Sequence, residues 1–127
     1  MRLALRIVTI AMGAGFALQG LGWLVAPDRA AATLGMPVLD GLGRSTQFGD
    51  FAAFFLTLGL SILVGNRPGQ ARVLYFPAAL LGSAALCRTV AWAAHGAAFA
   101  ATFISVEIVG SLILLAAAAQ PSEGGRR

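Results

Sequence analysis

Three ionisable side chains interrupt long apolar stretches of this chain. Asp50 lies in "FGDFA", Arg88 in "LCRTV" and Glu107 in "SVEIV". A charged group at the centre of a bilayer costs about 2.5–3.5 kcal/mol, so it faces a partner or a polar cavity rather than lipid. We therefore expect an inward-facing cluster in which Arg88 lies between the two carboxylates.

Such a cluster has two interpretations. Ionisable residues inside a membrane commonly mark a ligand or proton site. A buried polar cluster can instead serve only to fix the register of the helices. Both interpretations stay open on the sequence alone, and no residue is identified as catalytic.

Two glutamines extend the candidate site. Gln19 falls at the depth of the three charged groups, on a stripe that steps by three and four residues. Gln47 begins a second stripe of this kind, which contains Asp50 and continues to Phe54, Thr57 and Ser61. Residues with this spacing share one face of a helix. We expect both stripes to face inward.

Trp92 and His95 follow Arg88 along the same expected helix face. Trp92 either stacks on Arg88 or lies in the interfacial aromatic belt. His95, beside Gly96, is expected to be an exposed loop residue rather than a proton carrier. Cys87 is the single cysteine and His95 the single histidine, so we expect no metal site and no cofactor.

The composition indicates that the helices that carry these residues lie in a membrane. Of 127 residues, 58% are hydrophobic and 11% are charged, and the mean hydropathy is +0.83. A soluble domain this small cannot bury so much apolar surface. We predict four transmembrane helices, over about 6–25, 45–65, 72–93 and 98–119, because each is long enough to cross a bilayer.

The predicted fold is all-α: a polytopic membrane four-helix bundle with up-down-up-down order. One domain covers residues 1–119, and 120–127 form a disordered cytoplasmic tail. In the connection over 26–43, Pro27 and Asp28 favour a short interfacial helix. We expect the first helix to be retained rather than cleaved as a signal peptide, because cleavage after "LVA" would leave Pro27 first.

The arginines predict the orientation. The chain has nine arginines and no lysine, and its net charge is +4. Six of the arginines fall at the two termini and in the connection between the second and third helices, so the positive-inside rule places both termini in the cytoplasm. The absence of lysine and the abundance of alanine favour the bacterial cytoplasmic (inner) membrane. The arginines lie at the ends of apolar runs, so we expect no nucleic-acid partner.

The stretches "RSTQFGDFAAFFLTLGL", "CRTVAWAAHG" and "VEIVGSLILL" resemble a group of small bacterial four-helix membrane proteins of unknown function, DoxX-like in general architecture. Arg44, Arg88 and Glu107 match an arginine before the second helix, an arginine near the end of the third and a glutamate within the fourth. Asp50 stands where glycine is commoner in that group. The resemblance implies the fold and the membrane, and it supplies no activity.

Three functions fit these observations. The first is a non-enzymatic accessory or binding protein for a lipid or quinone-like ligand, which acts alone, as a homo-oligomer or with a partner membrane protein. The second is a membrane enzyme in which Asp50 and Glu107 transfer protons on a hydrophobic substrate. The third is a proton-coupled transporter. The first is favoured, because the sequence contains no nucleotide-binding loop, metal cluster or catalytic triad.

Overall fold

The computed structural model describes residues 3–120, and these residues are helical apart from short connections. In chain order, its elements are α1 Leu3–Val25, α2 Pro27–Thr33, α3 Gly41–Gly65, η1 Ala71–Leu74, α4 Tyr75–His95 and α5 Ala101–Ala118. Four of the helices are long and apolar enough to cross a membrane. The prediction of an all-α fold with four long apolar helices is confirmed, and the chain is a multi-pass membrane protein.

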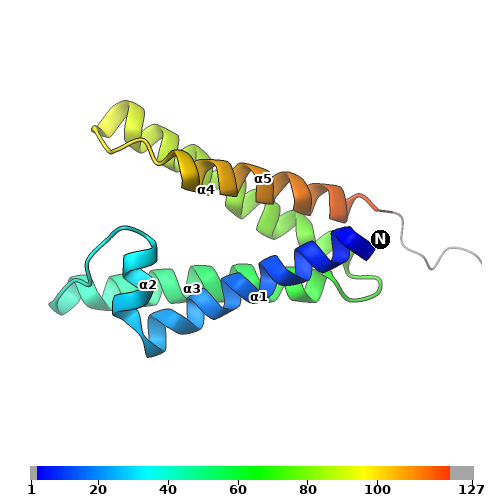
Figure 1. Cartoon of the computed structure of the whole chain (residues 1–127), viewed down its shortest axis with the longest axis horizontal. Coiled ribbons are helices and arrows are strands. Elements are labelled where there is room, and N and C mark those ends of the chain that lie inside the picture. The colour runs from blue at the N-terminus through cyan, green and yellow to red at the C-terminus, as the bar shows by residue number, and fades with distance from the viewer. Residues whose placement is uncertain (1–2, 121–127) are drawn as a thin grey trace, which may run out of the picture.

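The four long helices are arranged as two antiparallel pairs (Figure 1). One pair is α1 with α3, and the other is α4 with α5. The pairs meet near the beginning of α1 and diverge toward the opposite end, where α2 lies against the first pair. We call these two regions the closed end and the open end.

Glycines allow α1 and α3 to approach closely. A Cβ added at Gly59 of α3 would overlap the backbone of Ala17 in α1, and a Cβ at Gly20 would lie 2.7 Å from the backbone nitrogen of Leu56. Small residues have this role in membrane helices because lipid supplies no hydrophobic force between them. The α1–α3 seam is therefore the tightest helix contact in the described chain.

The glycine seam also corrects the face predicted for α3. The residues of α3 that are buried at helical spacing are Ala52, Phe55, Leu58 and Ile62. Of the predicted stripe, Gln47 is buried, but Asp50 and Thr57 are exposed. The predicted stripe is therefore not the packed face of α3, because close backbone approach at Gly59 decides how α3 turns toward α1. The α1 stripe that contains Gln19 does face inward, because Thr9 and Trp23, which lie on it at steps of three and four residues, are fully buried.

The closed end contains the core that joins the two pairs. Its large buried side chains come from every long helix except α1: Leu58 and Ile62 of α3, Leu81 of α4 and Leu114 of α5, together with Leu74 of η1. Thr9 of α1 adds a buried polar link there, because its hydroxyl donates to Asn66 Oδ1 at 2.8 Å. This core connects the pairs at one end only.

The short helix expected in the 26–43 connection is α2, which begins with Pro27. It covers Trp23, whose ring stacks on Phe51 of α3 at 4.9 Å between centroids. The tail predicted over 120–127 lies, beyond Gln120, outside the described residues. The open end is thus strengthened on the α1–α3 side, while α4 and α5 extend beside it without such a cover.

Candidate functional site

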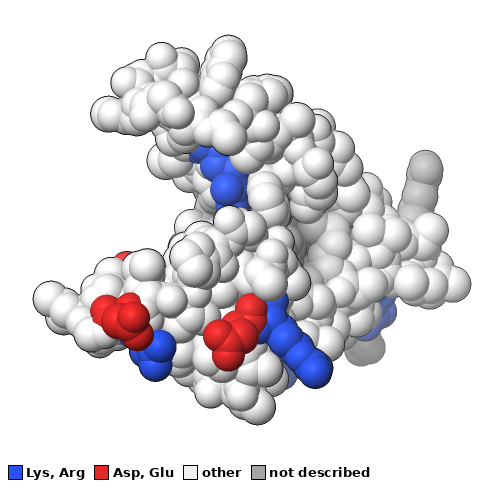
Figure 2. Space-filling view, turned by 60° about the vertical axis from the view of Figure 1, so that its left-hand side comes forward, with Lys and Arg blue, Asp and Glu red and all other residues white. Residues whose placement is uncertain are grey.

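A large cleft occupies the space between the diverging helix pairs. Its volume is about 1070 Å³, and it is open to the surroundings. Figure 2 shows the hollow, with mostly uncharged walls and a basic group on one of them. Every long helix contributes to the lining, which includes five phenylalanines: Phe16, Phe51, Phe54, Phe55 and Phe103. The arginine among the lining residues is Arg88.

Arg88 and Glu107 form an ion pair across α4 and α5. The guanidinium Nε donates to Glu107 Oε1 at 2.8 Å. Arg88 lies seven residues before the end of α4 and Glu107 six after the start of α5, so both are about 10 Å below the open end. The prediction that these two residues meet is confirmed by this contact.

The ion pair leaves polar groups unused on the cleft wall. Glu107 Oε2 is buried and has no hydrogen-bond partner in the described chain. The Arg88 side chain is 38% exposed, and its guanidinium lies over the ring of Phe103, 4.7 Å from the centroid. A buried carboxylate oxygen without a donor is costly. The arrangement therefore suits a ligand that brings a hydrogen-bond donor.

Asp50 lines the same cleft from the opposing pair, but the predicted ion pair with Arg88 is not found among the described residues. Asp50 is exposed on α3, on the side that the divergence of the pairs leaves open. The expectation of Arg88 between two acids assumed a closed bundle, in which the faces of α3 and α4 would touch at this depth. The open end separates them.

Gln19 lies on the cleft wall near α2. Its Nε2 group donates to the carbonyl oxygen of Ala30 at 3.1 Å and to Thr33 Oγ1 at 2.8 Å. These contacts attach α2 to α1, and both Gln19 and Thr33 border the cleft. Gln19 therefore has a structural role that also places polar atoms beside the cavity.

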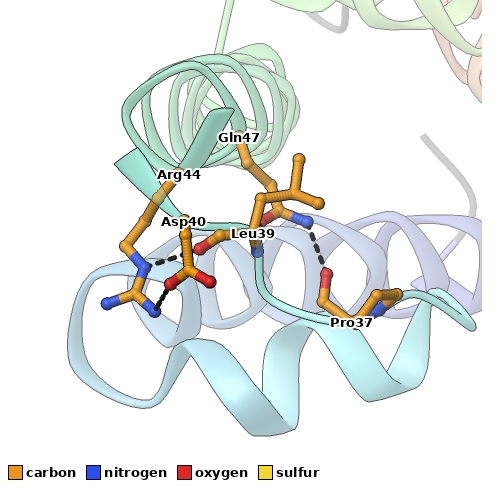
Figure 3. Close-up of polar contacts among 5 residues, drawn as sticks. All are labelled: Pro37, Leu39, Asp40, Arg44 and Gln47. Atoms are coloured by element: carbon orange, nitrogen blue, oxygen red, sulfur yellow. Dashed lines mark hydrogen bonds and ion pairs between the residues drawn. The ribbon is translucent and has the colours of Figure 1, made fainter. Parts of the chain in front are cut away.

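Gln47 does not line the main cleft. Its amide bridges the loop before α3: Nε2 donates to Pro37 O at 3.0 Å, and Oε1 accepts from Leu39 N at 2.9 Å (Figure 3). Arg44 closes the same turn through Leu39 O and Asp40. Gln47 borders a smaller pocket of about 490 Å³, which shares Asp50 and Phe51 with the main cleft. Gln47 thus orders the connection before α3, the helix that carries Asp50.

Trp92 and His95 are exposed and lie outside the cleft lining. Trp92 packs edge-on against Phe99 at 5.0 Å rather than on Arg88. His95 occupies the last turn of α4, before Gly96 in the left-handed conformation (φ 67°). The aromatic partner of Arg88 is Phe103, which sequence reasoning missed. Its spacing from Glu107, one helical turn, was the available signal.

The lining also includes Thr33 and Cys87, which were not identified as site residues from the sequence. Thr33 was hidden in the connection, and Cys87 was interpreted only as a packing residue, yet it is exposed on the cleft beside Arg88. Within residues 3–120, no group of three His, Cys, Asp or Glu side chains is placed to hold a metal ion. The cleft therefore offers hydrogen bonds, charge and aromatic surface.

Comparisons with known proteins give no match to a family model, to a curated protein or to a solved structure.

Proposed function

We propose that this protein binds a lipid or quinone-like amphipathic molecule in the cleft between its helix pairs. The observation that carries the proposal is the pairing of a mostly apolar cavity with a single ion pair, Arg88–Glu107, on its wall. Binding sites for small molecules combine apolar walls with a few polar groups that orient the ligand. The apolar part of the ligand lies along the phenylalanines, and its polar end lies at the ion pair.

The volume of the cleft supports this class of ligand. Small-molecule sites span about 300–1,000 Å³, and this cleft, at about 1070 Å³, is slightly larger. The opening between the pairs lies within segments long enough to span a bilayer. A hydrophobic ligand can then enter from the lipid without crossing water.

The orientation is part of the same proposal. Exposed Arg6 and Arg67 lie at the closed end, and Asp28 and Asp40 offset Arg29 and Arg44 at the open end. By the positive-inside rule, the closed end and both termini face the cytoplasm of a bacterium, and the cleft lies in the outer half of the inner membrane. Relationship to the DoxX-like group is likewise proposed, on Arg44, Arg88 and Glu107.

Gentle purification followed by native mass spectrometry tests the proposal. The wild-type protein should retain one amphipathic molecule per chain, and Arg88→Gln should retain much less. Arg72→Gln is the matched control, because this arginine lies in η1, outside the cleft lining. Equal retention by all three proteins would contradict binding at the ion pair.

A membrane enzyme is the second candidate, because Asp50 and Glu107 border the same cleft and could act as acid and base on a ligand between them. In that case the bound molecule should be converted over time by the wild-type protein, and the product should differ from it by proton rearrangement. A ligand that is recovered unchanged, whether or not the acids are replaced, would leave binding as the function.

A further inference from the structure

The charges on the cleft wall restrict the polar end of the ligand. Among residues 3–120, three ionisable side chains other than the thiol of Cys87 border the cleft, and they are Asp50, Arg88 and Glu107. Arg88 and Glu107 neutralise each other in their ion pair. Asp50 is exposed and has no ion pair among the described residues, so the wall carries one net negative charge, which disfavours an anion.

The hydrogen-bonding groups restrict the ligand further. Glu107 Oε2 is an acceptor, it is buried, and no donor reaches it from the described chain. Glu107 itself is only 8% exposed. An ionised carboxylate can accept but cannot donate, so the group that completes this site must carry an O–H or N–H.

We infer that the cleft selects a lipid whose head is an uncharged hydroxyl, in preference to a lipid with an anionic head. This inference rests on the proposed function. The hydroxyl donates to Glu107 Oε2, and its oxygen accepts from the terminal nitrogens of Arg88, whose only hydrogen bond in the described chain uses Nε. An anionic phosphate would bring further negative charge to a wall that Asp50 and Glu107 already border.

Three lipids with the same acyl chains test this selection. Dioleoylglycerol carries the hydroxyl, its 3-O-methyl ether lacks the donor, and dioleoyl phosphatidic acid carries an anion. Cys87 is the chain's single cysteine and borders the cleft beside Arg88, so its labelling by a maleimide reports occupancy. Each lipid is titrated into the purified full chain in phosphatidylcholine nanodiscs.

Dioleoylglycerol should protect Cys87 at a concentration roughly tenfold lower than the ether, since a hydrogen bond to a charged group contributes about that factor. Phosphatidic acid should protect no better than the ether. Equal protection by dioleoylglycerol and its ether, or stronger protection by phosphatidic acid, would overturn the inference while binding in the cleft stands. If none of the three lipids protects Cys87, the inference fails; if the wild-type protein also retains no amphipathic molecule, the proposed function fails with it.

Two variants check the assigned roles. Asp50→Asn removes the unpaired charge without breaking a contact, so it should improve protection by phosphatidic acid severalfold. Asp28→Asn, an exposed acid outside the cleft lining, should change nothing. Glu107→Gln should abolish the preference for the hydroxyl over the ether, because the amide also supplies a donor. A preference that survives Glu107→Gln would contradict the role given to Oε2.

Discussion

The closed end and the open end of this molecule use polar groups in opposite ways. At the closed end, Thr9 and Asn66 are buried and hydrogen-bonded to each other, and Leu58 and Ile62 fill the space between the pairs. At the open end, Arg88 is partly exposed and Glu107 keeps an unpartnered oxygen beside a large cleft. The polar groups of the closed end are hydrogen-bonded to each other, whereas Glu107 Oε2 at the open end is left free by the described residues to bind a ligand.

This difference indicates where stability and function reside. The α1–α3 seam and the closed-end core hold the fold together, so the open end can keep a cavity and an unsatisfied carboxylate. Natural membrane proteins place ionisable groups at such positions at a cost in stability when the groups serve a function. The comparison predicts the largest effect on stability at the seam and the smallest at Asp50, the exposed acid of the cleft wall.

The largest effect is expected at the seam. Gly59→Ala should lower the free energy of unfolding by about 2–3 kcal/mol, because the new methyl group meets backbone atoms that cannot move aside. Unfolding by SDS in mixed micelles measures the change. Gly15→Ala is the matched control, since no atom lies within 4 Å of its added Cβ. Equal effects of the two substitutions would show that close packing at the α1–α3 seam does not stabilise the fold.

The next effect is at the ion pair. Arg88→Gln should cost about 1–2 kcal/mol by the same measurement, because it leaves Glu107 without its partner, and the exposure of Arg88 moderates the loss. The double variant Arg88→Gln/Glu107→Gln should recover part of that loss. A double variant less stable than the single one would show that the pair is not the source of the effect.

At the closed end, Thr9→Val should cost about 1 kcal/mol, the usual contribution of one hydrogen bond between membrane helices. Thr57→Val removes the same hydroxyl from an exposed position of α3 and serves as the comparison. Both substitutions keep the size of the side chain, so only the one at Thr9 should lower the stability. Identical stabilities would mean that the Thr9–Asn66 contact contributes nothing.

The smallest effect is expected at Asp50. Asp50→Asn should change the free energy of unfolding by less than about 0.5 kcal/mol, because the side chain is exposed and makes no hydrogen bond in the described chain. Its effect should appear only in ligand selection. A large loss of stability would show that Asp50 stabilises the fold, and it would contradict the proposed difference between the two ends.

Much of the fold could be predicted from the sequence, because four apolar stretches of sufficient length leave few alternatives in a bilayer. The meeting of Arg88 and Glu107 also followed from their depth on adjacent antiparallel helices. The faces of α3 did not follow, because in lipid both the packed and the outer face are apolar, and hydropathy does not distinguish them. The glycine at 59 decides the packing, and glycines are frequent throughout the chain.

The divergence of the helix pairs also could not be predicted from the sequence. It depends on which buried residues, such as Leu74 and Leu114, join the pairs at one end and on the lack of an equivalent core within residues 3–120 at the other. A closed bundle would have brought Asp50 to Arg88. The separation of Asp50 from the ion pair, and the cleft itself, are therefore consequences of tertiary packing rather than of local pattern.

Photo-crosslinking in native membranes tests the central claim most directly. A benzophenone side chain at Phe103, on the cleft wall, should capture one defined amphipathic species at close to one molecule per chain. The same group at Leu112, which is 59% exposed and outside the cleft lining, should capture a mixture that matches the bulk lipid. The same mixture at both positions would contradict a binding site in the cleft.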